Sequence, residues 1–381
     1  MRIVEAGLAE ASARSIARLA DANPSAINYN LGGVEHLYKM VFEQAADEAV
    51  LWIEARIPDI ADLPSNSAGA CAALEYVIRA WTSQARDLAL LYQEALSWAS
   101  ADPSLLRRWT RSWRDFWVAI ALRCGLDETR GRMMNLLFQS EALYHLSPWS
   151  PAVESAALRD LCDHFGWVWL GAPRRAASGG VETAQARLHG ENLVKLAPAA
   201  LNLALSAVAV VQDKGLLGLT HRAVAAHAGV TVGAVTHYFR TAEDLVAGAI
   251  RGQVEELFQA EDADSAAALE RGAISSLAMF AEGIEGSVAS PAVVKVLFGR
   301  RSLFLASLRA PDRARAGAVV RFGYGRTTER ILSQIIQADR DAIPLHAAVM
   351  SRLVSSLWIV RLAEDAEAEP LGREVVARLD R

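Results

Sequence analysis

Residues 219–245 read LTHRAVAAHAGVTVGAVTHYFRTAEDL, and this stretch predicts two short helices joined by a tight turn. Thr220 precedes an apolar pattern and can cap the first helix by accepting a backbone N–H bond. Gly229 can adopt the left-handed conformation that ends this helix, and Thr231 can cap the next one. In the second helix the large apolar residues fall four positions apart on one face, so the other positions face outward. This is the layout of a helix-turn-helix, in which the second helix reads DNA.

A first copy of this arrangement lies 208 residues earlier, where residues 11–37 read ASARSIARLADANPSAINYNLGGVEHL. The two stretches align without a gap, and Ile27 keeps the apolar character of a position that is expected to be buried. Asp21 replaces the turn glycine, which is acceptable because aspartate enters the left-handed region more readily than most residues. Asn23 and Pro24 supply a helix cap and a first-turn proline. The sequence therefore predicts two DNA-reading heads in one chain.

The second copy resembles the TetR family of bacterial repressors over residues 198–255. The match lies in the capping threonine, the alanine-glycine-valine turn, and the tyrosine and phenylalanine that end the second helix. The lysine that usually opens the following helix and meets a phosphate is Ala242 here, and Val34 in the first copy. The resemblance implies a homodimer whose heads bind operator half-sites about 34–36 Å apart on double-stranded DNA. It also implies a pocket for a small apolar or aromatic effector.

The outward-facing positions of both copies are the candidate DNA contacts. In the second head they are Thr220, Arg222, Thr231, Val232, Gly233, Thr236, His237, Tyr238 and Arg240. In the first head they are Ser12, Arg14, Ser25, Asn28, Tyr29 and Asn30. Base contacts specify a sequence and phosphate contacts position the protein. We expect Thr231, Val232, Thr236 and His237 to meet bases, and Thr220, Arg222 and Tyr238 to meet phosphates.

The first head departs further from the family pattern than the second. Only MRIVEAGLAE precedes its motif, whereas the long apolar segment PAALNLALSAVAVVQD precedes the other. Either this head is trimmed, or the protein begins upstream of Met1. Residues 1–45 carry four cations against five carboxylates, and residues 212–251 carry four against three. The second head is therefore predicted to be the more basic of the two.

The composition of the whole chain predicts an all-α protein. Hydrophobic residues make up 52% of the 381 positions and charged residues 22%, and alternating strand-like patterns are nearly absent. The net charge of −5 does not exclude DNA binding, because the charge that matters is local. We expect these units: a first head at 1–45, a first body at 46–170, a linker at 171–192, a second head at 193–255 and a second body at 256–381.

Two tandem units could form a dimer within a single chain. Each half ends on an apolar segment, at 158–170 and 350–362, and these segments form a natural seam. Such a pseudo-dimer would be a ligand-responsive repressor on an asymmetric operator. Two alternatives remain: a homodimer of tandem chains that reads DNA only through the second head, and a helical ligand-binding or scaffold protein that has lost DNA binding.

Aromatic residues gather in the first half. Trp109, Trp113, Phe116 and Trp117 stand at i, i+4, i+7 and i+8 on one helical stripe, and Trp81, Tyr92 and Trp98 precede them. These residues either form a packed core or line the effector pocket that the family resemblance implies.

No catalytic or cofactor site can be assembled from this sequence. The histidines lack the spacing of a metal-ligand set, and no glycine-rich phosphate loop or nucleophile elbow is visible. Cys71, Cys124 and Cys162 are expected to be buried free thiols in a reducing cytosol, with a redox sensor as the alternative. We therefore expect a cytoplasmic protein that is not an enzyme, needs neither metal nor cofactor, and does not span a membrane.

Overall fold

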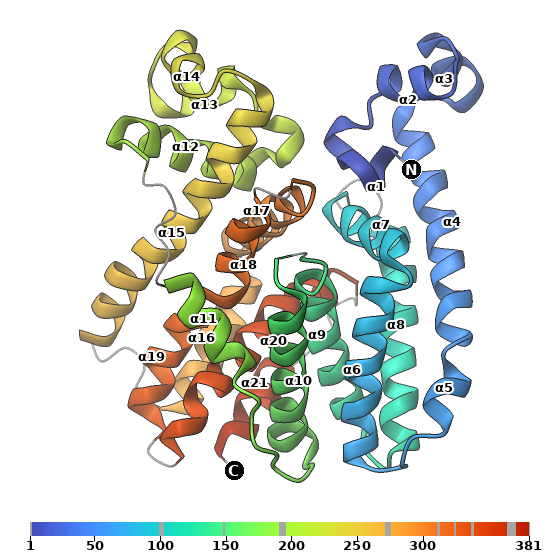
Figure 1. Ribbon diagram of the computed structural model, residues 1–381, viewed down its shortest axis with the longest axis vertical. Helices are drawn as coiled ribbons and strands as arrows, with labels where there is room; N and C mark the ends of the chain where they lie inside the picture. Colours follow the sequence, from blue (N-terminus) through green and yellow to red (C-terminus); the bar gives the residue numbers. More distant parts are fainter. Residues whose placement is uncertain are drawn as a thin grey trace.

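A computed structural model describes residues 2–98, 103–147, 149–189, 196–270, 276–310, 313–323, 325–336, 339–363 and 371–380. Within these ranges all regular structure is helical, which confirms the predicted all-α class. Figure 1 shows two small helical heads at one end of the molecule, α2 with α3 and α13 with α14, above a larger mass of packed helices.

The first half of the chain runs from the first head into a helical body. Its α-helices are α1 (Arg2–Ala6), α2 (Ala13–Leu19), α3 (Pro24–Leu31), α4 (Val34–Glu54), α5 (Ile57–Ala61), α6 (Ser67–Ser83), α7 (Arg86–Ser97), α8 (Pro103–Arg123), α9 (Glu128–Tyr144) and α10 (Pro151–Phe165). A short 3-10 turn, η1 (Leu8–Glu10), follows α1, and a π-helical segment, η2 (Gly166–Leu170), extends α10.

The second half has the same order of a head, a long helix and a body. After α11 (Gly180–His189) come α12 (Pro198–Lys214), α13 (His221–Ala228), α14 (Val232–Tyr238), α15 (Ala242–Glu270), α16 (Leu277–Ala289), α17 (Pro291–Ser307), α18 (Ala314–Gly323), α19 (Arg326–Ile335), α20 (Ile343–Ala363) and α21 (Leu371–Ala377). The 3-10 turns are η3 (Leu216–Gly218), η4 (Arg340–Ala342) and η5 (Arg378–Asp380).

The aromatic stripe of α8 is part of a packed core. The Trp113 ring lies 4.9 Å from that of Trp81 and 4.1 Å from that of Phe138 between ring centroids. Trp81, Trp109, Trp113 and Trp117 are at most 1% exposed. Neighbouring rings occupy the space that an effector would need, because α6 and α9 present large side chains to the same stripe. These tryptophans therefore form a packed core, which is one of the two alternatives that the sequence leaves open. They do not line the aromatic pocket that the other alternative predicts.

The remaining candidate pocket residues are divided between this core and another site. Phe116 is buried beside Trp117, and the Tyr92 hydroxyl donates a hydrogen bond to Gln139 Oε1 at 2.7 Å. Trp98 is only half-buried and instead packs against Tyr38 and Phe42 at the base of the first head.

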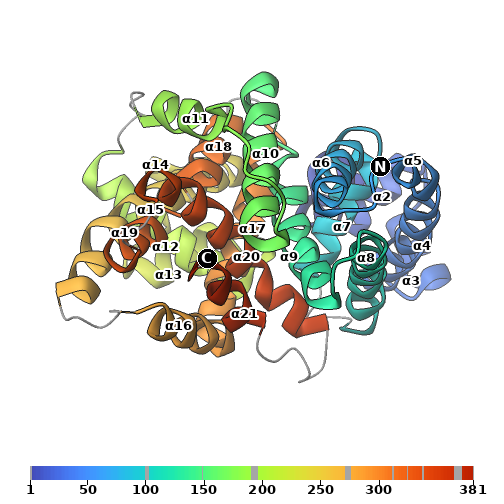
Figure 2. The same ribbon diagram turned by 90° about the horizontal axis from the view of Figure 1, so that it is seen from below.

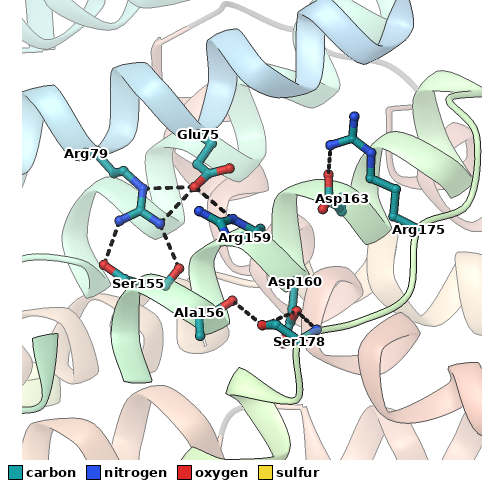
Figure 3. A network of polar contacts seen from close by, with 9 residues as sticks. All are labelled: Glu75, Arg79, Ser155, Ala156, Arg159, Asp160, Asp163, Arg175 and Ser178. Carbon is teal, nitrogen blue, oxygen red and sulfur yellow. Dashed lines mark hydrogen bonds and ion pairs between the residues drawn. The ribbon is translucent and has the colours of Figure 1, made fainter. Parts of the chain in front are cut away.

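The segment at 171–192 is not the free linker that its proline, glycine and serine content predicts. Figure 3 shows how Asp160 of α10 holds it: Ser178 N donates to the Asp160 carboxylate at 2.5 Å. Gly180 N donates to the same carboxylate at 2.7 Å. Arg175 adds an ion pair with Asp163 at 3.2 Å. Its second part is α11, which packs against α10 and α18. The segment is therefore docked up to residue 189, and residues 190–192 lie outside the described part of the chain.

The three cysteines are buried and free, as predicted. Burial raises the pKa of the Cys71 thiol to about 12 and also raises the pKa of Cys124 and Cys162. Buried thiols of this kind stay protonated and are poor nucleophiles, which favours a packing role over redox sensing.

The two halves meet along helices that lie in the middle of the molecule (Figure 2). Helix α9 packs against α20, α7 against α17, and α10 against α20. The predicted seam segments 158–170 and 350–362 do meet, since His164 and His346 share a hydrogen bond of 2.9 Å. However, α20 is not the last helix of its half, because α21 follows it and contacts α9.

A buried ion triad lies in this seam. Glu141 of α9 pairs with Arg321 of α18 at 2.9 Å and with Arg352 of α20. All three side chains are at most 1% exposed. Burial alone would raise the pKa of Glu141, but the two guanidinium groups outweigh it and hold the pKa below its usual value. The carboxylate therefore stays charged and ties the first half to the second.

One described helical stretch, Arg340–Val360, has the length and apolarity of a membrane span, yet 78% of its most apolar window is buried inside the protein. The pair Leu277–Gly286 and Pro291–Ser307, bent by 81°, qualifies only if it is counted as one span. Burial of this extent is typical of the core helix of a globular protein.

We predict that Glu141→Ala lowers the free energy of unfolding by about 3–5 kcal/mol, because it leaves two buried guanidinium groups without a counter-charge. Urea unfolding at neutral pH measures the loss. The matched control is Glu128→Ala, which removes a carboxylate of the same helix whose side chain is 60% exposed and pairs with Arg132. A change within about 0.5 kcal/mol is expected for it. Equal losses in the two variants would show that the triad does not stabilise the seam.

The histidine pair of the seam predicts a loss of stability in mild acid. Burial lowers the pKa of His164 to about 3 and that of His346 to about 4. Above about pH 6.5 both imidazoles are neutral in the folded and the unfolded chain. Below it only the unfolded chain takes up these protons, so stability falls by up to about 1.4 kcal/mol per pH unit for each group until the folded pKa is reached.

Urea unfolding between pH 7.5 and 4.5 measures this slope. His346→Gln should make it shallower, whereas the control His36→Gln on the exposed surface of α4 should leave it unchanged. A slope that is the same in both variants contradicts the assignment.

Candidate nucleic-acid interface

The second head folds as its capping residues predict. The Thr220 hydroxyl accepts a hydrogen bond from Ala223 N at 3.1 Å, and the Thr231 hydroxyl accepts one from Ala234 N at 3.3 Å. Gly229 ends α13 in the left-handed region with φ of 68°. These features set the sharp turn between α13 and α14.

A small core holds α14 against the rest of the head. Val224 and Val235 are fully buried and Phe239 is 6% exposed. A Cβ added at Gly248 would lie only 2.5 Å from the Phe239 ring, so α15 can approach the end of α14 closely because this position has no side chain. The recognition helix is thereby fixed to the long helix that leads into the body.

The outer face of this head carries the residues that the sequence marks as DNA contacts. Eight of them are exposed: Thr220, Arg222, Thr231, Val232, Gly233, His237, Tyr238 and Arg240. Thr236 is half-buried, and its hydroxyl donates to backbone carbonyls of α14 at 3.1 Å. Its oxygen can still accept a hydrogen bond from a base, but its proton is already used. Together the exposed groups form a donor and acceptor surface on a protruding helix.

Two contacts that sequence reasoning missed help to shape this surface. His221 Nε2 lies 2.7 Å from the carbonyl oxygen of Phe239, and this contact ties the start of α13 to the end of α14. Thr241 and Asp244 cap α15 reciprocally, each accepting a hydrogen bond of 3.0 Å from the backbone N–H of the other. The second contact was recognisable as a capping box in the sequence, whereas the first joins residues 18 positions apart and was not.

The first head has the same turn but a smaller core. Asp21 adopts φ of 49° and so replaces the turn glycine as expected, and Asn23 caps α3 by accepting a hydrogen bond from Ser25 N. Helix α1 is only five residues long and contacts α7 of the body, whereas α12 has 17 residues and packs against α13 and α15. Leu19 is consequently 64% exposed.

The candidate contacts of the first head also face outward. Ser12, Arg14, Ser25, Asn28, Tyr29 and Asn30 are all exposed. Tyr29 is the most prominent, with 91% of its surface exposed. The Ser12 hydroxyl caps α2 by accepting a hydrogen bond from Ser15 N, and the Ser25 hydroxyl donates to Asn23 Oδ1, so both are already engaged in local hydrogen bonds. The surface is polar but carries few cations.

A protruding helix-turn-helix with an exposed recognition helix defines a DNA-binding regulatory protein. Residues 205–249 match the family model described as "Bacterial regulatory proteins, tetR family", from within α12 to within α15. The chain therefore carries a DNA-binding domain of the TetR family, which supports a DNA-binding transcriptional regulator. Searches of curated proteins and of solved structures give no significant match.

We predict that Arg222→Ala weakens binding to all DNA sequences alike and lowers the slope of log affinity against log salt by about one, since a phosphate contact releases about one counterion. A genome-fragment selection supplies the binding site, and fluorescence anisotropy at several salt concentrations measures affinity. His237→Ala should instead reduce discrimination between sites. Arg132→Ala, in α9 of the body, is the control. An unchanged affinity and slope in Arg222→Ala would remove this residue from the interface.

Proposed function

We propose that this protein is a ligand-responsive repressor that works as a single-chain pseudo-dimer on an asymmetric operator. The observation that carries the proposal is the position of the two heads, which lie at the same end of one chain on opposite sides (Figure 1). A regulator of this kind needs two heads that face DNA together and meet successive major grooves.

The contacts in the seam support an internal dimer. By order after each head, α9 corresponds to α20 and α10 to α21. Both pairs meet across the seam: α9 contacts α20, and Trp169, in the π-helical extension of α10, donates its indole N–H to the carbonyl oxygen of Val375 in α21 at 2.9 Å. The cross pairs also occur, since α10 contacts α20 and α9 contacts α21. In an isologous interface the same surfaces meet in this reciprocal way.

A single contact near the heads adds to this argument. Arg301 of α17 donates a hydrogen bond to the Gln93 side chain of α7, and these residues stand 208 positions apart. The two helix-turn-helix motifs have the same spacing. Residues on a two-fold axis contact their own equivalents, so this pair marks where a pseudo-two-fold axis would pass.

The difference between the heads supports an asymmetric operator. The second head has the fuller core and the more basic surface, so we infer that it supplies most of the affinity. A covalent link removes the concentration dependence of pairing and frees each head to read a different half-site.

Repression and ligand response rest on the family membership. We infer that the bound chain blocks transcription from the DNA it occupies, and that an effector changes its affinity for that DNA. We also propose that it acts in the cytoplasm, without enzymatic activity of its own.

The pseudo-dimer predicts one chain per operator. Native mass spectrometry of the protein alone and with a selected DNA site measures the stoichiometry directly. One 41.2 kDa chain per DNA supports the proposal. Two chains per DNA would favour the alternative in which paired chains present only their second heads. A chain that selects no DNA fragment would favour a scaffold that has lost DNA binding.

A further inference from the structure

A cleft of about 1190 Å³ lies between the two halves at the base of the heads. One wall comes from α1, η1 and α7, and the other from the end of α12, η3, the start of α15 and α17. These elements flank the space between the heads in Figure 1. The cleft is distinct from the aromatic core of the first body, and of the pocket residues expected from sequence only Trp98 lines it.

Two arginines that line this cleft, Arg309 and Arg313, each keep one buried donor atom without a partner. Arg309 pairs with Glu94 and donates through Nη1 to the carbonyl oxygen of Leu305, but its Nε is buried and unpaired. Arg313 pairs with Glu243 at 2.8 Å, and its Nε is likewise buried and unpaired. Their side chains are only 13% and 14% exposed. Unpaired buried donors cost about 1–3 kcal/mol each, and an anionic oxygen is the acceptor that suits them best.

Apolar side chains form much of the remaining lining, beside charged residues of both signs at its exposed parts, such as Glu5, Glu10 and Lys295. Leu8, Leu106 and Leu305 are buried against the cleft, and Trp98 and Phe298 line it with half-buried rings. Apolar walls with a few convergent charged donors suit a ligand that has an apolar body and one anionic end.

We propose that this cleft binds an amphipathic monocarboxylate, with its carboxylate on the Nε edges of Arg309 and Arg313 and its apolar body against Trp98 and Phe298. The site uses residues of both halves, so one chain holds one ligand. Two separate pockets, one in each body, would hold two.

The position of the cleft connects the ligand to both heads. On the first side, Trp98 contacts Tyr38, whose hydroxyl donates to the carbonyl oxygen of Ala11 at 2.6 Å just before α2. On the second side, Arg313 holds Glu243 in the first turn of α15, directly after the recognition helix. A ligand that contacts Trp98 and Arg313 together fixes the separation of the heads. This regulatory step rests on the proposed function, whereas binding itself does not.

The experiment is isothermal titration calorimetry of the full chain with dodecanoate below its critical micelle concentration, first without DNA. We expect one dodecanoate per chain. Arg313→Gln should weaken binding by about tenfold, the effect of one charge-assisted hydrogen bond. The matched control is Arg132→Gln, because Arg132 also makes a 2.8 Å pair with a glutamate but lies in α9, outside the cleft. Ala310→Trp, which places a large ring in the cleft, should abolish binding.

The ligand class has its own control. Dodecylammonium carries the same chain with the opposite charge and should bind at least tenfold more weakly than dodecanoate. Tighter binding of the ammonium would mean that the acidic side chains of the cleft, Glu5 and Glu10 among them, select a cation and would overturn the proposal. No dodecanoate binding, two molecules per chain, or equal affinities of Arg313→Gln and Arg132→Gln would also overturn it.

DNA binding by the same proteins separates this inference from the proposed function. Dodecanoate should change the affinity for the selected DNA site by about tenfold or more in the native chain and in Arg132→Gln, but not in Ala310→Trp. If the chain binds DNA but not dodecanoate, the proposed function stands and the cleft proposal is wrong. If the chain binds one dodecanoate through Arg313 but selects no DNA, the cleft proposal stands and the proposed function is wrong.

Discussion

The arrangement of the two halves depends on the buried pairing of Glu141 with Arg321 and Arg352. Burying three charges is unfavourable unless their partners come close with good geometry. The carboxylate comes from the first half and both guanidinium groups come from the second, so neither half can bury its share alone. Sliding one half past the other would leave charges unpaired in an apolar seam. The triad therefore favours a single relative orientation.

That orientation decides what the heads can do together. They stand at one end of the molecule, and the long helices α4 and α15 connect each of them to the fused bodies. In a dimer of separate chains the distance between heads depends on an association that dilution can reverse. Here the same distance depends on packing within one chain, and under our proposal also on the ligand in the cleft between the heads. A rigid seam and a cleft at the base of both heads would then allow regulation by a single bound molecule.

Local chemistry made much of the fold and of the interface predictable. The caps at Thr220 and Thr231, the left-handed Asp21 and the exposed positions of α14 follow from short-range rules that need only neighbouring residues. Contacts between distant residues were not predictable in this way. The hydrogen bond from His221 to Phe239, the docking of residues 171–189 on Asp160, and the filling of the tryptophan stripe by Phe138 all depend on which elements meet.

By itself the sequence determined the helical class, the two helix-turn-helix motifs and the residues that they expose, because helix caps, turns and apolar periodicity act within a few residues. The tertiary structure decided that the aromatic stripe is core, that the expected linker is docked, and that a cleft of about 1190 Å³ lies between the halves. A stripe that faces packed rings and one that faces a cavity have the same periodicity. Only the position of the opposing helices distinguishes them.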